Sequence, residues 1–232
     1  MEAGCCIIIS VLDGTHHLKT HERKKLRMNA KEHWEHVYAA KPATEVSWYQ
    51  SEAKVSLSLI QQVASEDSAI IDIGGGASTL VDGLLKTGFR NVTVLDIANT
   101  ALDESRRRLG DVAREVQWIV ANILEFPFER HSVDVWHDRA VFHFLTSSAD
   151  RRQYVQQVVN AVRPGGHVIV GTFAEDGPDK CSGLDVCRYS PSSLHAEFGD
   201  PFVLKKSVLE EHMTPWGKSQ RFQYCLCRVI GI

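Results

Sequence analysis

The sequence of 232 residues has no apolar run long enough to cross a bilayer, and no secretory signal pattern stands before its first cysteines. Its charge is not one-sided either, because 26 basic residues stand against 29 acidic ones. This balance argues against nucleic acid as a main partner, which would favour a clustered positive field. A charged fraction of 24% and an apolar fraction of 44% exclude a largely disordered chain. We therefore expect a soluble globular protein that does not enter membranes.

Cysteine is too sparse for a disulfide scaffold, since the chain has only six. A reducing, cytoplasmic location is therefore the better expectation. Cys225 and Cys227 would point to one face of a strand, either as ordinary thiols or as a metal or redox pair. Cys181, His143 and His212 would form a metal site only if their loops converge. We favour the interpretation that the thiols are ordinary core or surface side chains, and we expect no bound metal.

One domain is the simplest organisation for this length. Residues 1–27 are expected to form a flexible extension. Residues 28–232 are expected to form the folded domain. Within it, we expect a helical lid segment over 28–64, a cofactor-binding core over 69–173, and acceptor loops with two further strands over 174–232.

Short apolar runs alternate with helical stretches from residue 69 onward. Strands are predicted at 69–73, 92–95, 116–120, 133–136 and 167–172, and helices at 29–40, 51–64, 79–87, around 109 and at 150–162. The tail adds two strand-like runs, 202–209 and 221–229, without a helix between them, so they must pair antiparallel or sit apart. The pattern predicts an α/β, Rossmann-like, mostly parallel sheet with helices on both faces.

A glycine-rich turn follows the first predicted strand, in the segment Asp72-Ile73-Gly74-Gly75-Gly76-Ala77-Ser78. Glycines there allow backbone amides to approach a ligand closely. Asp96 stands about 20 residues further on, at the end of the second predicted strand, where a carboxylate can accept both ribose hydroxyls. The two features together indicate a nucleoside cofactor.

The turn also discriminates between cofactors. A dinucleotide fingerprint requires a third glycine where this sequence has Thr79. Asp72 at the head of the turn would repel a pyrophosphate, whereas it suits a cofactor with a positive centre and an ammonium group. S-adenosylmethionine carries both, so we expect this cofactor and disfavour a nicotinamide oxidoreductase.

At this point the chain resembles the class I S-adenosylmethionine-dependent methyltransferases. Four segments match in the family's order and spacing: Asp72-Ile73-Gly74-Gly75-Gly76, Val94-Leu95-Asp96, 122–128 and 162–167. The resemblance implies a seven-stranded sheet whose last strand is antiparallel. It also implies cofactor-binding roles for residues of these segments, namely Asp72, Gly74, Gly75 and Gly76 near the methionine part, Asp96 and Ile97 near the ribose, and Asn122 and Ile123 beside the adenine. The family often has Asp where Asn122 stands.

A narrower likeness follows the fourth predicted strand. Asp138-Arg139-Ala140 resembles a segment of the thiopurine-type S-methyltransferases. In that family the segment lies beside cofactor and acceptor, which implies that Asp138 contacts both.

Acceptor groups are expected on loops at the carboxyl ends of the strands. The candidates for catalysis are Asp138, Arg139, His143 and His212, with structural pairing as the alternative for each. The candidates for substrate binding are Trp34, Tyr38, Trp48, Tyr49, Phe144 and Arg188. For the aromatic members, core packing is the competing interpretation.

These observations predict a methyltransferase that acts on a small-molecule nucleophile, with a thiol or sulfide favoured. The first alternative is a protein (lysine) methyltransferase. The second is a regulatory module that binds the cofactor without catalysis.

Overall fold

The structure, a computed structural model, describes residues 20–231, with side chains from Ala30 onward. Residues 1–19 of the expected N-terminal extension lie outside the described residues. The helices are α1 (Thr20–Ala40), α2 (Lys54–Gln61), α3 (Leu80–Lys86), α4 (Asn99–Leu109), α5 (Ser148–Ala161) and α6 (Pro191–Phe198), with 3-10 turns η1 (Ala43–Glu45), η2 (Gly110–Glu115) and η3 (Phe142–Phe144). The strands are β1 (Ile70–Ile73), β2 (Val92–Asp96), β3 (Val116–Val120), β4 (Val133–Arg139), β5 (Val162–Phe173), β6 (Lys180–Cys181), β7 (Leu184–Asp185), β8 (Phe202–Met213) and β9 (Ser219–Val229).

Seven strands form one sheet in the order β3-β2-β1-β4-β5-β9-β8, and β6 pairs only with β7. Strands β1 to β5 are parallel to their neighbours among themselves, whereas β9 is antiparallel to both β5 and β8. The predicted fold class, a mostly parallel sheet with an antiparallel last strand, is therefore confirmed. The two strands of the tail, β8 and β9, pair antiparallel, which is one of the two arrangements expected from the sequence.

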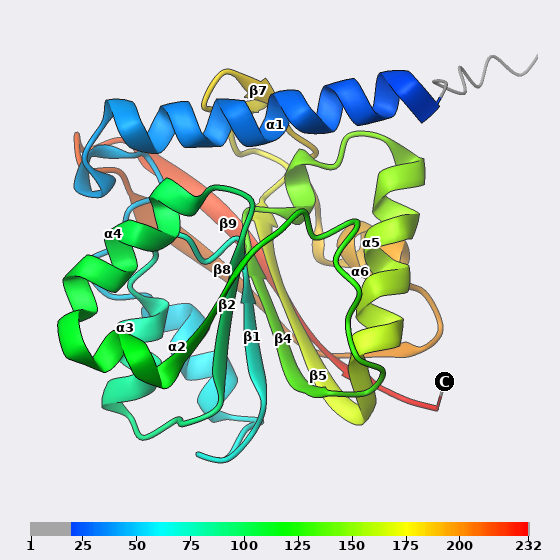
Figure 1. The fold of residues 1–232 in the computed structure, drawn as a ribbon. Coiled ribbons are helices and arrows are strands. Elements are labelled where there is room, and N and C mark those ends of the chain that lie inside the picture. Colours follow the sequence, from blue (N-terminus) through cyan, green and yellow to red (C-terminus); the bar gives the residue numbers. More distant parts are fainter. Residues whose placement is uncertain (1–19, 232) are drawn as a thin grey trace, which may run out of the picture.

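Helices cover both faces of the sheet, with α2, α3 and α4 on one face and α5 and α6 on the other (Figure 1). All four residues of β1 are buried, and they alternate between the two layers. Ile71 and Ile73 join one apolar core, while Ile70 joins the other. Burial on both faces explains why this strand reads as a continuous apolar run in the sequence.

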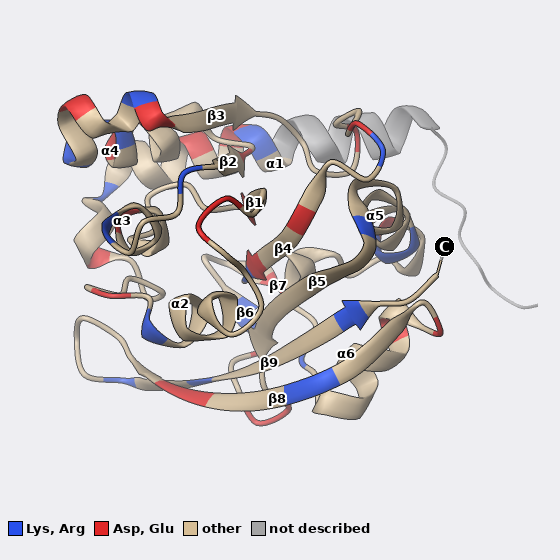
Figure 2. Cartoon of the chain, turned by 90° about the horizontal axis from the view of Figure 1, so that it is seen from below, with Lys and Arg blue, Asp and Glu red and all other residues tan. Residues whose placement is uncertain are grey.

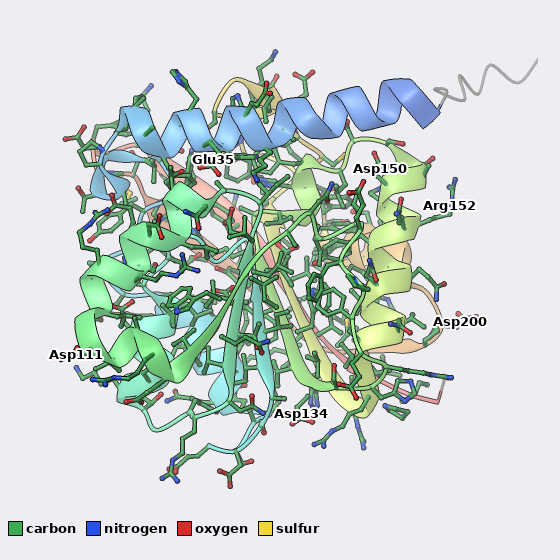
Figure 3. All side chains as sticks on the ribbon, viewed as in Figure 1. Glu35, Asp111, Asp134, Asp150, Arg152 and Asp200 are labelled. Atoms are coloured by element: carbon green, nitrogen blue, oxygen red, sulfur yellow. The ribbon has the colours of Figure 1, made fainter. Side chains whose placement is uncertain are left out.

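α1 lies across the carboxyl ends of the parallel strands, above the edge where β1, β2 and β4 end (Figure 1). It begins at Thr20, earlier than the expected helix start at residue 29. Glu35 of α1 accepts a hydrogen bond from the amide of Thr100 at the start of α4 (Figure 3), and Trp34 of α1 packs against Phe144. The N-terminal segment is thus part of the enclosure of the sheet edge.

The structure corrects several predicted boundaries. β4 continues beyond residue 136 to Arg139, and β5 already begins at Val162. The Pro-Gly-Gly segment at 164–166 therefore lies inside a strand, where the register with β4 shifts. α6 was not predicted, although Ser190 caps it and Pro191 opens it, which is a recognisable helix start.

Lys and Arg are interspersed with Asp and Glu on α4 and along β8 (Figure 2). The charge pattern of these elements agrees with the balanced composition. Within residues 20–231, no helix is both long and apolar enough to span a membrane.

Candidate functional site

The glycine-rich turn that follows β1 leaves no room for a Cβ atom at Gly74 or Gly75. Gly74 has a φ of 65°, and a Cβ on it would lie 2.1 Å from Cγ2 of Val141. A Cβ on Gly75 would lie 2.4 Å from Oδ2 of Asp72. The turn is therefore held close to the end of β4 and to its own leading carboxylate, and the glycines are required by space as well as by dihedral angle.

Side chains of α4 fix the turn from behind. The Ser105 hydroxyl donates to the carbonyl of Gly76 at 2.6 Å. The Arg108 guanidinium donates to the carbonyls of Ala77 and Ser78 at 3.0 and 2.6 Å and pairs with Asp82. Because its carbonyls are held in this way, the turn is preorganised rather than free to adapt.

Asp96 ends β2 and is almost fully enclosed, with 6% of its surface exposed. Its Oδ1 accepts a hydrogen bond from the amide of Ala98 at 2.8 Å. Burial, reinforced by the nearby Asp72 carboxylate, raises the pKa of Asp96 to about 7 despite that hydrogen bond. A ligand that donates hydroxyl hydrogen bonds to this carboxylate would favour its charged form.

Asp72 and His137 form a buried pair between the ends of β1 and β4. Nδ1 of His137 lies 2.7 Å from Oδ1 of Asp72, and both side chains are at most 4% exposed. A carboxylate accepts, so this bond places the proton of a neutral imidazole on Nδ1 and leaves Nε2 as an acceptor. In the described part of the chain, Nε2 is buried without a hydrogen-bond partner.

Arg139 is held on the same face of β4, two residues further on. Its Nε donates to the Tyr224 hydroxyl at 2.9 Å, and Nη1 donates to the Trp48 carbonyl at 3.2 Å. Glu210 lies 3.6 Å from Nε, and the guanidinium stacks on the ring of Phe222 at 4.0 Å. Nη2 is buried and finds no hydrogen-bond partner among residues 30–231.

Asp72, His137 and Arg139 line one cleft of about 540 Å³, measured out to its open mouth, and Asp96 is not part of this lining. One wall is the glycine-rich turn and the start of α3, and the opposite wall comes from the N-terminal segment. The lining includes Tyr38, Trp48, Tyr49, Asp72, Gly74, Gly75, Thr79, His137 and Arg139. The cleft therefore brings an unpartnered acceptor, His137 Nε2, and an unpartnered donor, Arg139 Nη2, together with the turn.

Aromatic side chains close the cleft region beneath α1. The Trp34 ring packs edge-on against Trp48 at 5.8 Å and against Phe144 at 5.1 Å, and Tyr38 meets Trp48 at 6.2 Å. Four of the six expected substrate-binding residues are thus in one cluster, and Tyr49 lines the cleft nearby. The sixth, Arg188, is exposed and donates to the carbonyl of Gly177 at 3.1 Å. The structure does not bring Arg188 to the cleft.

Asp138 lies on the opposite face of the sheet from His137 and Arg139. Its carboxylate accepts from the amides of Val141 and Phe142 at 2.8 and 3.0 Å and from the Tyr154 hydroxyl at 2.5 Å. Burial raises the pKa of Asp138 to about 6, against the lowering effect of these hydrogen bonds. The structure gives this expected catalytic and cofactor-binding residue a different position, in which it holds the turn η3.

The two expected catalytic histidines are enclosed as well. His143 is fully buried between Phe144 and Phe173, and its Nδ1 accepts from the Phe173 amide at 3.3 Å. Burial, followed by the charge of Arg139, lowers the pKa of His143 to about 3. His212 donates from Nε2 to the carbonyl of Ser47 at 2.7 Å, and burial lowers its pKa. Burial therefore favours the neutral form of both imidazoles.

The residues expected beside the nucleoside follow β2 and β3 at the same edge of the sheet. Ile97 comes directly after Asp96 and is half-buried. Oδ1 of Asn122 accepts from the amide of Leu124 at 3.0 Å, so this side chain shapes its own loop. Ile123 is buried in the apolar core.

The alternative metal site is not assembled. Across residues 30–231, no three His, Cys, Asp or Glu side chains are grouped as metal ligands. Cys181 is buried, and burial raises the pKa of its thiol to about 11.

Sequence reasoning missed His137 and Glu35. The signal for His137 was available, because side chains in a strand repeat with period two and Arg139 had been selected. Glu35 had no comparable signal, since its partners Asn99 and Thr100 are far away in the sequence.

Known proteins are similar to this chain in sequence and in fold. Residues 71–170 match the family model described as a methyltransferase domain. Nodulation protein S from Rhizobium tropici is 28% identical over 102 residues, which cover 44% of this chain and 42% of that protein. EEF1A lysine methyltransferase 2 from Danio rerio is 25% identical over 159 residues, 62% of this chain and 68% of that protein. The chain thus spans less than half the length of the nodulation protein that it matches.

A solved structure extends the likeness to almost the whole fold. The 1,6-didemethyltoxoflavin-N1-methyltransferase from Burkholderia thailandensis, which contains S-adenosylhomocysteine, superposes with a TM-score of 0.64 and 17% identity over 92% of each chain. Residues 71–170 are therefore similar to a methyltransferase domain, and the chain shares the fold of a methyltransferase of known structure over 92% of its length. The resemblance to methyltransferases noted in the sequence is confirmed over this segment.

Proposed function

We propose that this protein transfers the methyl group of S-adenosylmethionine to a small-molecule nucleophile, with a thiol or sulfide favoured. The observation that carries the proposal is the cleft below the glycine-rich turn. It holds one unpartnered acceptor on His137 and one unpartnered donor on Arg139. An ammonium and a carboxylate, the two charged groups of the methionine part, match this pair.

The remaining cofactor contacts follow from the edge of the sheet. Asp96 would accept the ribose hydroxyls, with Ile97 beside it. Asn122 and Ile123 would border the adenine, and the turn 74–76 would lie against the methionine chain. Arg139, a candidate for catalysis from the sequence, is better suited to the carboxylate of the cofactor. When bound, the cofactor supplies a methyl group on a positively charged sulfur.

The acceptor preference rests on the state of the histidines. His143 is buried and neutral, with a pKa of about 3, and His212 is engaged with Ser47. Neither is placed to take a proton from an alcohol or an amine at the cleft. A thiol needs no such base, because part of it is already thiolate in water near neutral pH. The surrounding rings of Trp34, Trp48 and Phe144 would exclude water from the reacting groups.

A protein acceptor is the second candidate. The observation that favours it is the similarity to a relative named as a lysine methyltransferase, which spans the larger share of this chain. The aromatic closure beneath α1 favours the small molecule instead, because a lysine side chain on a protein needs an open approach.

The experiment is a methyl-transfer assay with S-adenosylmethionine labelled in the methyl group. Hydrogen sulfide, small alkyl and aromatic thiols, small amines and a protein extract serve as separate acceptors. We expect label on thiols and S-adenosylhomocysteine formed in equal amount. Label only in the protein fraction would overturn the small-molecule acceptor, and cofactor binding without turnover on any acceptor would favour a regulatory module.

A further inference from the structure

Asp72 leads the glycine-rich turn, and one oxygen of its carboxylate is engaged by a neighbouring imidazole. Oδ1 is bonded to His137 at 2.7 Å. Oδ2 lies against the backbone of Gly75, where a Cβ would come within 2.4 Å of it. The residue is 3% exposed. Asp72 and His137 both line the cleft, and Nε2 of His137 is a buried nitrogen there that has no partner among the described residues.

We propose that Nε2 of His137 is a direct acceptor for the ammonium group of S-adenosylmethionine, and that Asp72 acts as the positioning residue of the imidazole ring. This inference rests on the proposed function. The Asp72 carboxylate keeps the imidazole proton on Nδ1, so that the lone pair of Nε2 faces the cleft. The negative charge of Asp72 then favours a cation on the other side of the ring.

The position of Arg139 supports this assignment. Residues 137 and 139 point to the same face of β4, because side chains alternate along a strand. Arg139 keeps a free Nη2 while its other nitrogens hold Tyr224 and Trp48. One strand thus presents an acceptor and a donor at two-residue spacing, which fits an ammonium and a carboxylate on the same carbon atom.

A His–Asp pair of this geometry also occurs as a general base. In that role His137 would take a proton from the acceptor and would not discriminate between cofactor analogues. The two roles of His137 predict different effects of removing the imidazole on the affinity for the cofactor product, measured without a methyl acceptor. An ammonium acceptor lowers this affinity when it is removed, whereas a general base does not.

The test is calorimetric titration with three ligands. S-adenosylhomocysteine has the complete amino-acid part, its deaminated analogue lacks only the ammonium, and 5′-methylthioadenosine lacks the whole amino-acid part. The proteins are wild type, His137→Phe, His137→Gln and Asp72→Asn. His167→Gln, a half-buried histidine of β5 outside the cleft lining, serves as the matched control.

We expect His137→Phe to weaken S-adenosylhomocysteine by about 10- to 100-fold, the range for one hydrogen bond to a charged group. The deaminated analogue and 5′-methylthioadenosine should bind wild type and His137→Phe equally. His137→Gln, which retains an acceptor oxygen, should recover part of the loss. Asp72→Asn should weaken S-adenosylhomocysteine selectively, because it removes the charge behind the ring.

Equal losses for all three ligands in His137→Phe and Asp72→Asn would overturn the inference and leave the cofactor assignment intact. Unchanged S-adenosylhomocysteine affinity with reduced turnover in His137→Phe would also overturn it, in favour of a general base. If His137→Phe does not fold, the ligand selectivity of His137→Gln and Asp72→Asn decides the question. Failure of wild type to bind S-adenosylhomocysteine would overturn the proposed function itself.

Discussion

The Glu35 carboxylate of α1 caps α4 by accepting hydrogen bonds from both the amide and the hydroxyl of Thr100, at 3.1 and 2.7 Å. The amide of Asn99 donates to the same carboxylate at 2.9 Å. A negative charge at a helix N-terminus is favourable, because the first amides have no partner within the helix. This cap attaches α1 to the start of α4, close to the end of β2 at Asp96 (Figure 3).

We predict that Glu35→Ala lowers the free energy of unfolding by about 1 kcal/mol, the typical effect of losing a helix cap. It should also accelerate dissociation of S-adenosylhomocysteine, because α1 loses its attachment to α4. Urea denaturation and stopped-flow fluorescence measure the two effects. Glu32→Ala, on the exposed side of the same helix, is the control. Equal behaviour of the two variants would show that the cap does not hold the helix.

The buried carboxylate of Asp96 makes stability depend on pH in a defined direction. Its pKa in the folded protein is about 7, raised from 3.8 chiefly by burial. A raised carboxyl pKa stabilises the fold below the unfolded value, and this contribution is lost as the pH rises through about 7. We predict that Asp96→Asn gains stability relative to wild type between pH 4 and pH 8, by on the order of 3 kcal/mol. Thermal unfolding across this range measures it.

Asp111→Asn provides the matched control for that series, since Asp111 is exposed at the surface. Its difference from wild type should stay small over the same pH range. A flat difference between Asp96→Asn and wild type would mean that Asp96 is hydrated in solution.

The positions of the glycine-rich turn and of Asp96 were accessible from the sequence because these residues are local to strand ends. The glycine turn follows one apolar run and the acid follows the next, so the sequence predicts that both lie at strand ends. In the structure β1 ends at Ile73 and β2 ends at Asp96. Neighbouring parallel strands then bring the two ends together without further information.

The arrangement of residues 137–139 was less accessible because its prediction depended on where β4 ends. The sequence indicated a strand only to residue 136, since Asp138 and Arg139 are charged. In the structure β4 continues to Arg139, so His137 and Arg139 share one face and Asp138 takes the other. The hydrogen-bond partners of residues 137–139 come from distant segments of the chain, and they are Tyr154, Tyr224 and Asp72. No local pattern encodes those distances.

Gly74 offers a test of the close approach between the turn and the end of β4. Gly74→Ala adds a Cβ at 2.1 Å from Val141 and imposes a positive φ on alanine, so we expect a loss of about 2 kcal/mol or more. Gly199→Ala isolates the backbone effect, because Gly199 has a φ of 75° and open space around its Cβ position. Urea denaturation should show the larger loss at Gly74, and adding Val141→Ala should recover the difference. Equal losses at both glycines would refute the steric argument.

Arg139 provides a test of the carboxylate assignment. Arg139→Lys keeps the charge but loses the fork that reaches Tyr224, Trp48 and the cleft together. We predict that S-adenosylhomocysteine binds this variant at least about 10-fold more weakly, whereas its decarboxylated analogue binds both proteins alike. Calorimetry measures both ligands, and Arg221→Lys, at an exposed position, is the control. Equal weakening of the decarboxylated analogue would place the carboxylate elsewhere.

The order of the strands has a consequence for how the chain assembles during synthesis. β8 precedes β9 in the sequence, but β9 lies between β8 and the rest of the sheet. β8 therefore emerges from the ribosome with no strand to join, while β5 waits with an open edge. Both edges remain available to other nascent chains until residue 229 has been made. Slowing translation between residues 213 and 219 should thus promote aggregation more than an equal delay between residues 96 and 116, where each new strand meets a neighbour that is already present.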